Sequence, residues 1–445
     1  MSINKLNKTV AFYTLGCKVN QYETEVIKKD FLDNNYIEVD FEEKSDVYVI
    51  NTCTVTSVAD KKNRKMIRRA ITRNPEAKLI VTGCYAQTNI EELKEIKEID
   101  YIIGNAKKEN VYEIFSRDLS NYQVDNIFDE KEYSSRKFTI LRDKARAFVK
   151  IQDGCNKFCS YCKIPYARGL SRSRSSKDII EEVTYLVKEG YREIVITGIN
   201  MSEYGIDLEE SINFDDIVEQ ILEVSGIERV RVSSVYPDTL SDRFIQMLST
   251  NSKLMPHLHI SVQSLDDEIL RLMKRKYNAQ YVVEKLQRVQ KLVPEVSLTA
   301  DIIVGFPRET EECFQNTLNN IKKINFSDLH VFPYSDRERT AALLIDGKID
   351  SKVKKERVKR IQEMNDLNFI EFRKNQIGKV HKVYIEEINK GLAIGYTENY
   401  LKTYVNVKEQ EGIERNIKIS DVVTVKIIGF DKMMLEGEIL WKRFC

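Results

Sequence analysis

Residues 145–335 contain six strand-like segments that alternate with helical ones. The strand-like segments are FVKIQ, EIVITGIN, RVRVSSVYP, HLHISVQS, LTADIIVGF and LHVFPYS. Amphipathic stretches such as DIIEEVTYLVKEG and FDDIVEQILEVSG separate them. Strands that alternate with helices in this way form parallel sheets, and repeated units of this kind build a barrel or part of one. We therefore expect an α/β fold with a central partial (βα)6 barrel over residues 141–374, whose reactive groups lie at the carboxyl ends of the strands.

Two further regions flank the expected barrel. In residues 8–120, the runs VAFYTL, VYVIN, KLIVT and YIIG alternate with amphipathic stretches, which predicts a smaller parallel α/β domain. Residues 121–140 show no clear periodicity and are interpreted as a linker. Residues 375–442 hold short alternating strands with turns between them, which predicts a small all-β barrel. A chain of 445 residues has room for these three domains at roughly 150 residues each.

The overall composition narrows the possible partners. The formal net charge is +1, so any contact with nucleic acid has to be local. The first residues, MSINKLNKTV, lack the apolar core of a signal peptide, and no run of about 18 apolar residues could span a bilayer. We therefore expect a cytoplasmic protein with no membrane partner. In that compartment the eight cysteines are not expected to form disulfides, which favours metal binding or catalysis for those that cluster.

The most specific motif is GCNKFCSYCKIPYARG, residues 154–169. Cys155, Cys159 and Cys162 come directly after the first expected barrel strand, so one tight loop can present three thiolates to a metal centre. Three thiolates leave one iron of a four-iron cluster free to bind a small molecule. The alternative is a zinc loop or three core cysteines, but a structural zinc site needs a fourth ligand nearby. The four histidines all lie far downstream, at His257, His259, His330 and His381.

Three more cysteines each end a strand-like run in residues 8–120. Cys17 follows VAFYTLG, Cys53 follows VYVINT, and Cys84 follows LIVTG. Neighbouring parallel strands have their carboxyl ends at one edge of the sheet, so these remote cysteines can converge there. Each cysteine alone could be a buried residue at a strand end. The shared placement of all three favours a second cluster with three protein ligands.

The first motif resembles the CxxxCxΦC signature of the radical S-adenosylmethionine (SAM) enzymes, with Tyr161 as the aromatic residue. The resemblance implies that the three cysteines hold a [4Fe–4S] cluster whose open iron chelates the amino and carboxylate groups of SAM. Reduction then cleaves SAM to a 5′-deoxyadenosyl radical. It also implies SAM contacts around Tyr161 and, near the strand ends, at Gly198, Asn200, Ser233 and Gln263. Turn or capping roles would explain these strand-end residues equally well.

The chain as a whole is similar to the methylthiotransferases. LGCKVNQYETE, NTCTVTSVADKK and TGCYAQ resemble the amino-terminal domain of that family, and a radical SAM domain and a terminal TRAM domain follow in the same order. The resemblance implies a second [4Fe–4S] cluster on Cys17, Cys53 and Cys84. It also implies two partners, an electron donor such as flavodoxin or ferredoxin and a sulfur source. The chain departs from the family at Arg308 in VGFPRET, where a glycine is usual, which leaves the detail of that turn open.

Within the family, TLGCKVNQYE and IPYARGLSRSR are most similar to the branch that acts on tRNA. That branch converts N6-threonylcarbamoyladenosine at position 37, in the anticodon stem-loop, to its 2-methylthio derivative. One alternative is a methylthiotransferase for N6-isopentenyladenosine in tRNA or for a ribosomal-protein aspartate. An alternative from a different class is a non-catalytic RNA-binding protein stabilised by metal.

Two regions are candidates for contact with RNA. The stretch KKNRKMIRRAITR, residues 61–73, carries seven basic residues and no acid. It could bind phosphates near Cys53, or it could be a solvated helix face. The terminal barrel is the stronger candidate, because small barrels of this kind bind RNA. Cys313 and Cys445 have no partner in the sequence pattern and are given no function.

Overall fold

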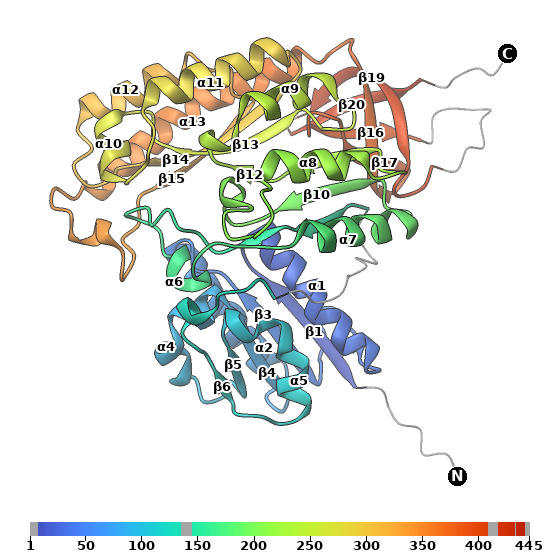
Figure 1. Cartoon of the computed structure of the whole chain (residues 1–445), viewed down its shortest axis with the longest axis vertical. Helices are drawn as coiled ribbons and strands as arrows, with labels where there is room; N and C mark the ends of the chain where they lie inside the picture. The colour runs from blue at the N-terminus through green and yellow to red at the C-terminus, as the bar shows by residue number, and fades with distance from the viewer. Residues whose placement is uncertain (1–7, 135–144, 408–416, 432, 441–445) are drawn as a thin grey trace.

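The amino-terminal domain is built on a six-stranded parallel sheet with helices on both faces (Figure 1). Its strands, in spatial order, are β2 (Ile37–Glu38), β1 (Thr9–Thr14), β3 (Val47–Thr52), β4 (Lys78–Gly83), β5 (Tyr101–Ile103) and β6 (Tyr122–Gln123). Helices α1 (Lys18–Asp33) and α5 (Val111–Ser116) pack on one face, and α2 (Ser57–Arg73) packs on the other. The remaining helices are α3 (Cys84–Thr88), α4 (Ile90–Lys94) and the 3-10 helix η1 (Asn105–Asn110).

The structure, a computed structural model, describes residues 8–134, 145–407, 417–431 and 433–440. Within these ranges no helix is both long enough and apolar enough to cross a bilayer. The segment interpreted as a linker contributes structure at two places, because residues 122–123 form the edge strand β6 and residues 127–129 form the 3-10 helix η2 (Ile127–Asp129). A two-residue strand is too short to show periodicity, which explains why the pattern missed it. Residues 135–140 of that segment lie outside the described ranges.

The central domain is a partial parallel barrel, as predicted. One sheet has the order β11-β10-β7 and the other β12-β13-β14-β15, and β11 and β12 are one stretch interrupted only at Ser233. The strands are β7 (Ala147–Lys150), β10 (Glu193–Thr197), β11 (Arg229–Val232), β12 (Ser234–Val235), β13 (His257–Gln263), β14 (Ser297–Val304) and β15 (Asp328–Pro333). The outer helices are α7 (Ser176–Lys188), α8 (Phe214–Glu223), α9 (Asp242–Thr250), α11 (Ala279–Leu292), α12 (Glu311–Ile321) and α13 (Ser351–Lys374). One continuous hydrophobic core joins these helices to the strands.

Shorter elements of the central domain connect the strands to the outer helices. They are α6 (Ile164–Arg168), η3 (Met201–Glu203), η4 (Pro237–Thr239), α10 (Asp267–Leu272) and η5 (Ala341–Leu344). A two-stranded antiparallel ribbon, β8 (Gln152–Asp153) with β9 (Arg172–Ser173), brackets the loop that carries the CxxxCxxC motif. This ribbon fixes both ends of that loop beside the end of β7.

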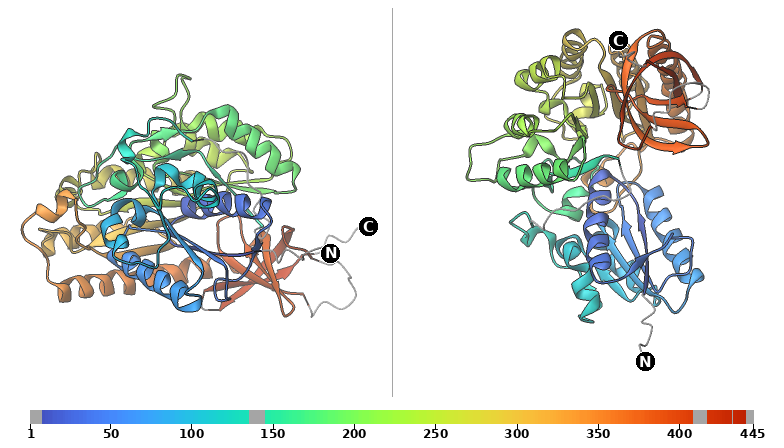
Figure 2. Two further views of the ribbon diagram at one scale, coloured as in Figure 1. Left: turned by 90° about the horizontal axis from the view of Figure 1, so that it is seen from below. Right: turned by 90° about the vertical axis from the view of Figure 1, so that its right-hand side faces the viewer.

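The carboxy-terminal domain is a closed five-stranded barrel, as predicted, with the order β16-β17-β18-β20-β19. Its strands are β16 (Val380–Asn389), β17 (Leu392–Tyr396), β18 (Lys402–Asn406), β19 (Val422–Asp431) and β20 (Met434–Ile439). The barrel lies against the central domain and above the amino-terminal domain in the right-hand view of Figure 2. Buried arginines of β11 make the contact, since Arg229 donates to the carbonyl oxygen of Lys382 at 3.1 Å and Arg231 to that of Glu398 at 3.0 Å.

Candidate functional site

The loop after β7 gathers Cys155, Cys159 and Cys162. Cys155 and Cys159 are buried and Cys162 is partly exposed. Backbone N–H groups of the loop point at two of the sulfurs, from Lys157 to Cys155 Sγ at 3.5 Å and from Ile164 to Cys162 Sγ at 3.4 Å. A cavity of about 90 Å³ borders Cys159 and Cys162. Donors aimed at the sulfurs, beside a free space, fit thiolates that hold a metal cluster.

The thiols of Cys155 and Cys162 are protonated at neutral pH when no metal is bound. Burial is the main cause that raises the pKa of Cys155 to about 11. Burial and the neighbouring Cys159 raise the pKa of Cys162 to about 12. Metal binding therefore has to release protons here.

The residues expected to contact SAM lie at the carboxyl ends of the barrel strands. Gly198 and Asn200 follow β10, Ser233 separates β11 from β12, and Gln263 ends β13. Asn200 is buried, and its Nδ2 donates to Cys155 Sγ at 3.5 Å. Tyr161 packs edge-on against Phe306. Their binding of SAM stays a prediction.

Arg275 is a further charged residue at this site that the sequence pattern did not reveal. It is 8% exposed, and its guanidinium lies 4.5 Å from the ring centre of Tyr236. One nitrogen donates to the hydroxyl of Tyr161 at 2.9 Å, but Nε and Nη1 have no hydrogen-bond partner within the described residues. A buried cation with unused donors needs an anion. Burial opposes the charge, but the surrounding tyrosines, and after them Cys159, raise the pKa of Arg275. Its position fits a negatively charged ligand beside the cysteine loop.

The second group of cysteines converges at the carboxyl edge of the amino-terminal sheet, as the strand pattern predicted. Two glycines make this possible because each adopts a left-handed backbone conformation, with φ of +100° at Gly16 and +101° at Gly83. A Cβ on Gly16 would lie 2.8 Å from Cys53 Sγ, and a Cβ on Gly83 would lie 2.5 Å from the carbonyl oxygen of Thr52. The glycine before the cysteine therefore lets neighbouring strand ends approach each other closely.

The sulfurs of this second group share one environment. Burial and then Cys84 raise the pKa of Cys53 to about 12, and Cys17 adds to this effect. Cys17 is exposed and is the N-cap residue of α1. Desolvation by the surrounding protein nevertheless raises the pKa of its thiol, and the positive charge of Arg168 lowers it in part. The side chain of Asn105 donates to Cys84 Sγ at 3.6 Å. The three side chains thus lie near one another at one edge of the sheet, and their role as cluster ligands stays a prediction.

A buried ionic network joins the two cysteine groups. Arg168 ends α6, directly after the CxxxCxxC loop, and it contacts Glu23 on α1 at 2.8 Å. Lys108 and Lys150 also pair with Glu23, at 2.7 and 2.8 Å, and Asp153 pairs with Lys150 at 2.7 Å. Three cations thus face two carboxylates, and Arg168 Nε has no partner in the described part of the chain. This surplus of positive charge fits an anionic, thiolate-ligated cluster next to Arg168.

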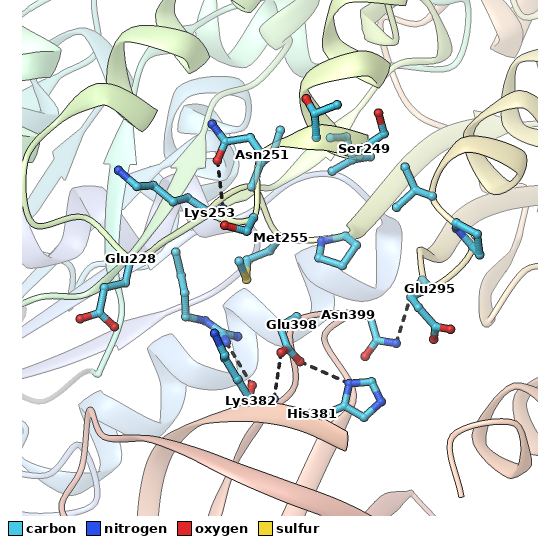
Figure 3. Close-up of a pocket in the computed structure, with 18 of the residues that line it drawn as sticks. Glu228, Ser249, Asn251, Lys253, Met255, Glu295, His381, Lys382, Glu398 and Asn399 are labelled. Carbon is cyan, nitrogen blue, oxygen red and sulfur yellow. Dashed lines mark hydrogen bonds and ion pairs between the residues drawn. The ribbon is translucent and has the colours of Figure 1, made fainter. Parts of the chain in front are cut away.

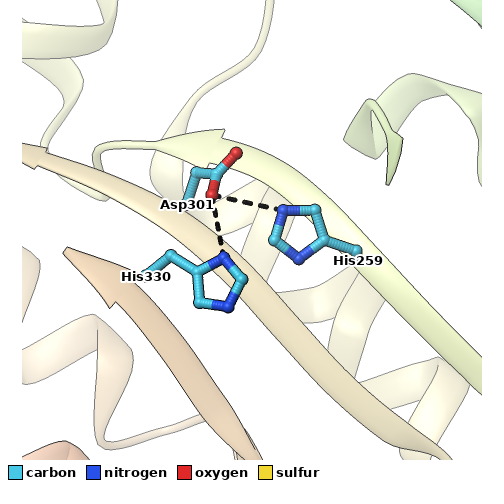
Figure 4. Close-up of side chains that lie close together, drawn as sticks. All are labelled: His259, Asp301 and His330. Atoms are coloured by element: carbon cyan, nitrogen blue, oxygen red, sulfur yellow. Dashed lines mark ion pairs between the residues drawn. The ribbon is translucent and has the colours of Figure 1, made fainter. Parts of the chain in front are cut away.

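A third polar group lies on the inner face of the barrel. Asp301 stands between two histidines of the neighbouring strands (Figure 4), with Oδ1 at 3.2 Å from His259 Nε2 and 3.5 Å from His330 Nδ1. The opposite faces of these strands belong to the hydrophobic core under the helices. Burial alone would raise the pKa of Asp301, but the two histidines hold this pKa well below its usual range. The interior of the barrel is therefore polar.

A wide cavity lies away from both cysteine groups. Its volume is about 1090 Å³, and it separates the amino ends of β11 and β13 from the terminal barrel (Figure 3). Lys253 and Glu228 line it from the central domain, and His381 and Glu398, which contact each other at 3.2 Å, line it from the barrel. Its lining mixes both signs of charge and carries no cysteine. We assign no chemistry to this cavity.

The basic helix α2 is less positive than its sequence suggests. Arg64 pairs with Glu92 at 2.7 Å, and Arg69 and Arg73 both pair with Glu42. Lys61, Lys62, Lys65 and Arg68 are exposed. The acidic partners come from distant parts of the sequence, so the charge run alone overstated the basic surface.

Comparison with known proteins supplies the family. Two family models match, the Radical SAM superfamily over residues 149–321 and the Uncharacterized protein family UPF0004 over residues 9–104. The chain is 40% identical over 440 residues to threonylcarbamoyladenosine tRNA methylthiotransferase MtaB of Bacillus subtilis (strain 168), which covers 97% of this chain and 96% of the relative. The chain belongs to the radical SAM methylthiotransferase family. This enzyme transfers a methylthio group to tRNA, uses SAM and carries two [4Fe–4S] clusters, so the ribosomal-protein and non-catalytic alternatives are set aside.

Other matches to this methylthiotransferase agree with its fold and family. It is 32% identical to tRNA-2-methylthio-N(6)-dimethylallyladenosine synthase of Thermodesulfovibrio yellowstonii, which covers 97% of this chain and 99% of the relative. Among solved structures, the radical S-adenosylmethionine methyltransferase TsrM from Kitasatospora setae matches with a TM-score of 0.55 at 12% identity, over 74% of this chain and 75% of that chain. At this identity the likeness shows the fold alone.

Proposed function

We propose that this methylthiotransferase converts N6-threonylcarbamoyladenosine at position 37 of tRNA to its 2-methylthio derivative. The observation that carries the proposal is the 40% identity, over nearly the whole chain, to a relative named for that nucleoside. Relatives named for dimethylallyladenosine reach 32% and 34% over the same length. Because its substrate would be tRNA, we place the enzyme in the cytoplasm.

The two cysteine groups divide the chemistry in this proposal. A four-iron cluster held by Cys155, Cys159 and Cys162 supplies, when bound, the reductive cleavage of SAM. Arg275, with two unused nitrogens beside this loop, binds the carboxylate of SAM, and Asn200 orients the site. The second group, at the sheet edge, holds the sulfur that is transferred. The protein encloses the target base so that water stays away from the radical.

Two partners complete the proposal. The enzyme needs an electron donor such as flavodoxin or ferredoxin and a source of sulfur. The terminal barrel and the exposed lysines of α2 are the proposed contacts with the anticodon stem-loop.

The substrate is tested with reconstituted enzyme and tRNA from strains that lack the gene. Mass spectrometry of the nucleosides should show the 2-methylthio derivative of threonylcarbamoyladenosine. A product on isopentenyladenosine alone would overturn the choice of substrate.

The division of labour is tested with two triple variants. Cys155, Cys159 and Cys162 changed together to alanine should lose about four irons and all 5′-deoxyadenosine formation. The same change at Cys17, Cys53 and Cys84 should also remove about four irons but leave SAM cleavage measurable, while methylthiolation stops. If the second variant still methylthiolated tRNA, the sheet-edge group would have no part in sulfur transfer.

A further inference from the structure

All three domains meet around Tyr400, in the loop between β17 and β18 of the terminal barrel. Its ring stacks on Tyr396 at 4.6 Å between ring centres and lies 4.6 Å from the ring of His257 on β13. The guanidinium of Arg231 lies 4.6 Å from the Tyr400 ring, and that of Arg146 lies 5.2 Å from it. Tyr400 therefore packs against residues at or near the amino ends of strands of the central domain.

The cations at this junction outnumber the carboxylates. Glu193 pairs with Arg229 at 2.6 Å and with Arg231 at 3.0 Å, and lies 3.8 Å from Arg146. Arg146 also donates to Glu386 at 3.1 Å. Lys18 is the fourth cation, and its ammonium lies 5.8 Å from the Tyr400 ring. Four cations thus gather around Glu193 and Glu386, and these two carboxylates pair with the three arginines.

Lys18 is the cation left over at this junction. Among the residues that the structure describes, no carboxylate forms an ion pair with its ammonium. It is the first residue of α1, so the positive end of the helix dipole adds to its charge. It also directly follows Cys17, one of the sheet-edge cysteines. A cation without a carboxylate, beside the aromatic ring of Tyr400, is suited to receive an anion from outside the chain.

We propose that Lys18, supported by Arg146, binds the carboxylate of the threonylcarbamoyl group on the target adenosine. This inference rests on the proposed function and adds the residue that selects the substrate within the family. The two nucleosides named for the relatives differ in the charge of their N6 substituent, because threonylcarbamoyl carries a carboxylate and dimethylallyl is apolar and neutral. A lysine next to the sulfur site can read that difference.

The position of Lys18 favours the base substituent over a backbone phosphate. C2, which receives the sulfur, and N6, which carries the substituent, belong to the same ring, so the carboxylate has to lie close to the sheet-edge cysteines. Lys18 is fixed there by its neighbour Cys17. The stacked rings of Tyr396 and Tyr400 further suit a small anion attached to a flat base rather than an extended chain of phosphates.

Binding to anticodon stem-loops tests the inference without turnover. Three RNAs are compared on the reconstituted enzyme, with threonylcarbamoyladenosine, its neutral threonine amide, or plain adenosine at position 37. The intact enzyme should bind the carboxylate form at least about tenfold more tightly than the amide. Lys18→Met should abolish this difference, and Lys18→Arg should keep part of it. The matched control is Lys29→Met, an exposed lysine of the same helix paired with Asp33, which should leave the ratio unchanged.

Three results would overturn the inference. The intact enzyme could bind the amide as tightly as the carboxylate. Lys18→Met could weaken all three RNAs equally, which would assign the lysine to a backbone phosphate. The preference for the carboxylate could also remain in both Lys18→Met and Arg146→Met. Arg146→Met replaces Lys18→Met as the test if Lys18→Met loses iron, because Arg146 is not next to a cysteine in the sequence. If the intact enzyme modified only dimethylallyladenosine, the proposed function itself would fail; modification of threonylcarbamoyladenosine without carboxylate preference would reject Lys18 alone.

Discussion

The guanidinium of Arg168 grips both carboxylate oxygens of Glu23, with Nη1 at 2.8 Å from Oε1 and Nη2 at 2.9 Å from Oε2. Glu23 lies on the helix that begins after Cys17, and Arg168 lies on the short helix that follows Cys162. This buried, bidentate pair crosses the boundary between the amino-terminal and central domains. It couples the placement of one cysteine group to that of the other.

Glu23→Gln should destabilise the protein strongly. The change leaves Arg168, Lys108 and Lys150 with Asp153 as the remaining carboxylate of the network, and removing one partner from a buried ionic group costs about 3 to 5 kcal/mol. Urea unfolding measures the loss. The control is Glu91→Gln, which removes an exposed pair with Lys94 and should cost less than about 0.5 kcal/mol. An equal loss of unfolding free energy in the two variants would show that the buried pair does not stabilise the protein more than an exposed pair does.

Arg275→Met should weaken SAM binding by about tenfold or more, because the buried guanidinium has two nitrogens without partners beside the CxxxCxxC loop. Equilibrium dialysis with labelled SAM measures the affinity, and iron content checks that the cluster is retained. Arg271→Met changes an exposed arginine paired with Glu268 and should have no effect. Unchanged SAM affinity in Arg275→Met, with iron retained, would refute the assignment.

His330 should titrate above the ordinary histidine pKa of about 6.5. The hydrogen bond to Asp301 is the main cause that raises its pKa, and burial opposes it. Because the folded-state pKa is raised, the stabilisation is fully present below the ordinary pKa and is lost as pH rises through the raised value. NMR titration of the ring protons measures the pKa of His330. In Asp301→Asn the pKa of His330 should fall. An unchanged pKa of His330 in this variant would exclude the ion pair.

Arg308→Gly should stabilise the protein by about 1 kcal/mol. Arg308 occupies a left-handed backbone conformation with φ of +67°, which glycine adopts without steric cost. Its backbone N–H still donates to the carbonyl oxygen of Gly347 at 2.8 Å, so the turn keeps its hydrogen bond in the variant. Arg308→Ala is the control and should bring no such gain, because alanine has the same strain. Thermal unfolding separates the two variants.

The sequence predicted what local patterns encode. Alternating strands and helices predicted the parallel sheets, and the common edge of parallel strands predicted that Cys17, Cys53 and Cys84 meet. The departure at Arg308 was visible as well, and the structure shows that the arginine takes over the left-handed conformation natural to glycine.

Contacts between domains were beyond those patterns. The pair of Glu23 with Arg168 joins residues that are 145 positions apart, and periodicity within an element does not say which charged face another domain will cover. The same holds for Arg275, whose hydrogen bond to the hydroxyl of Tyr161 joins residues that are 114 positions apart. Buried arginines show no hydrophobic signal, so only the folded structure reveals them.

The loop that carries Tyr400 would give the terminal barrel a second role beside its proposed contact with RNA. This loop faces Lys18, and the carbonyl oxygens of the barrel accept hydrogen bonds from the buried Arg231. Exchanging barrels between relatives would therefore change the surroundings of Lys18 together with the proposed tRNA contact. Substrate choice and RNA affinity would then change in one step. In a lineage that alters the terminal barrel, the choice of modified nucleoside would change as well. The evolution of this domain would then be coupled to the evolution of substrate specificity.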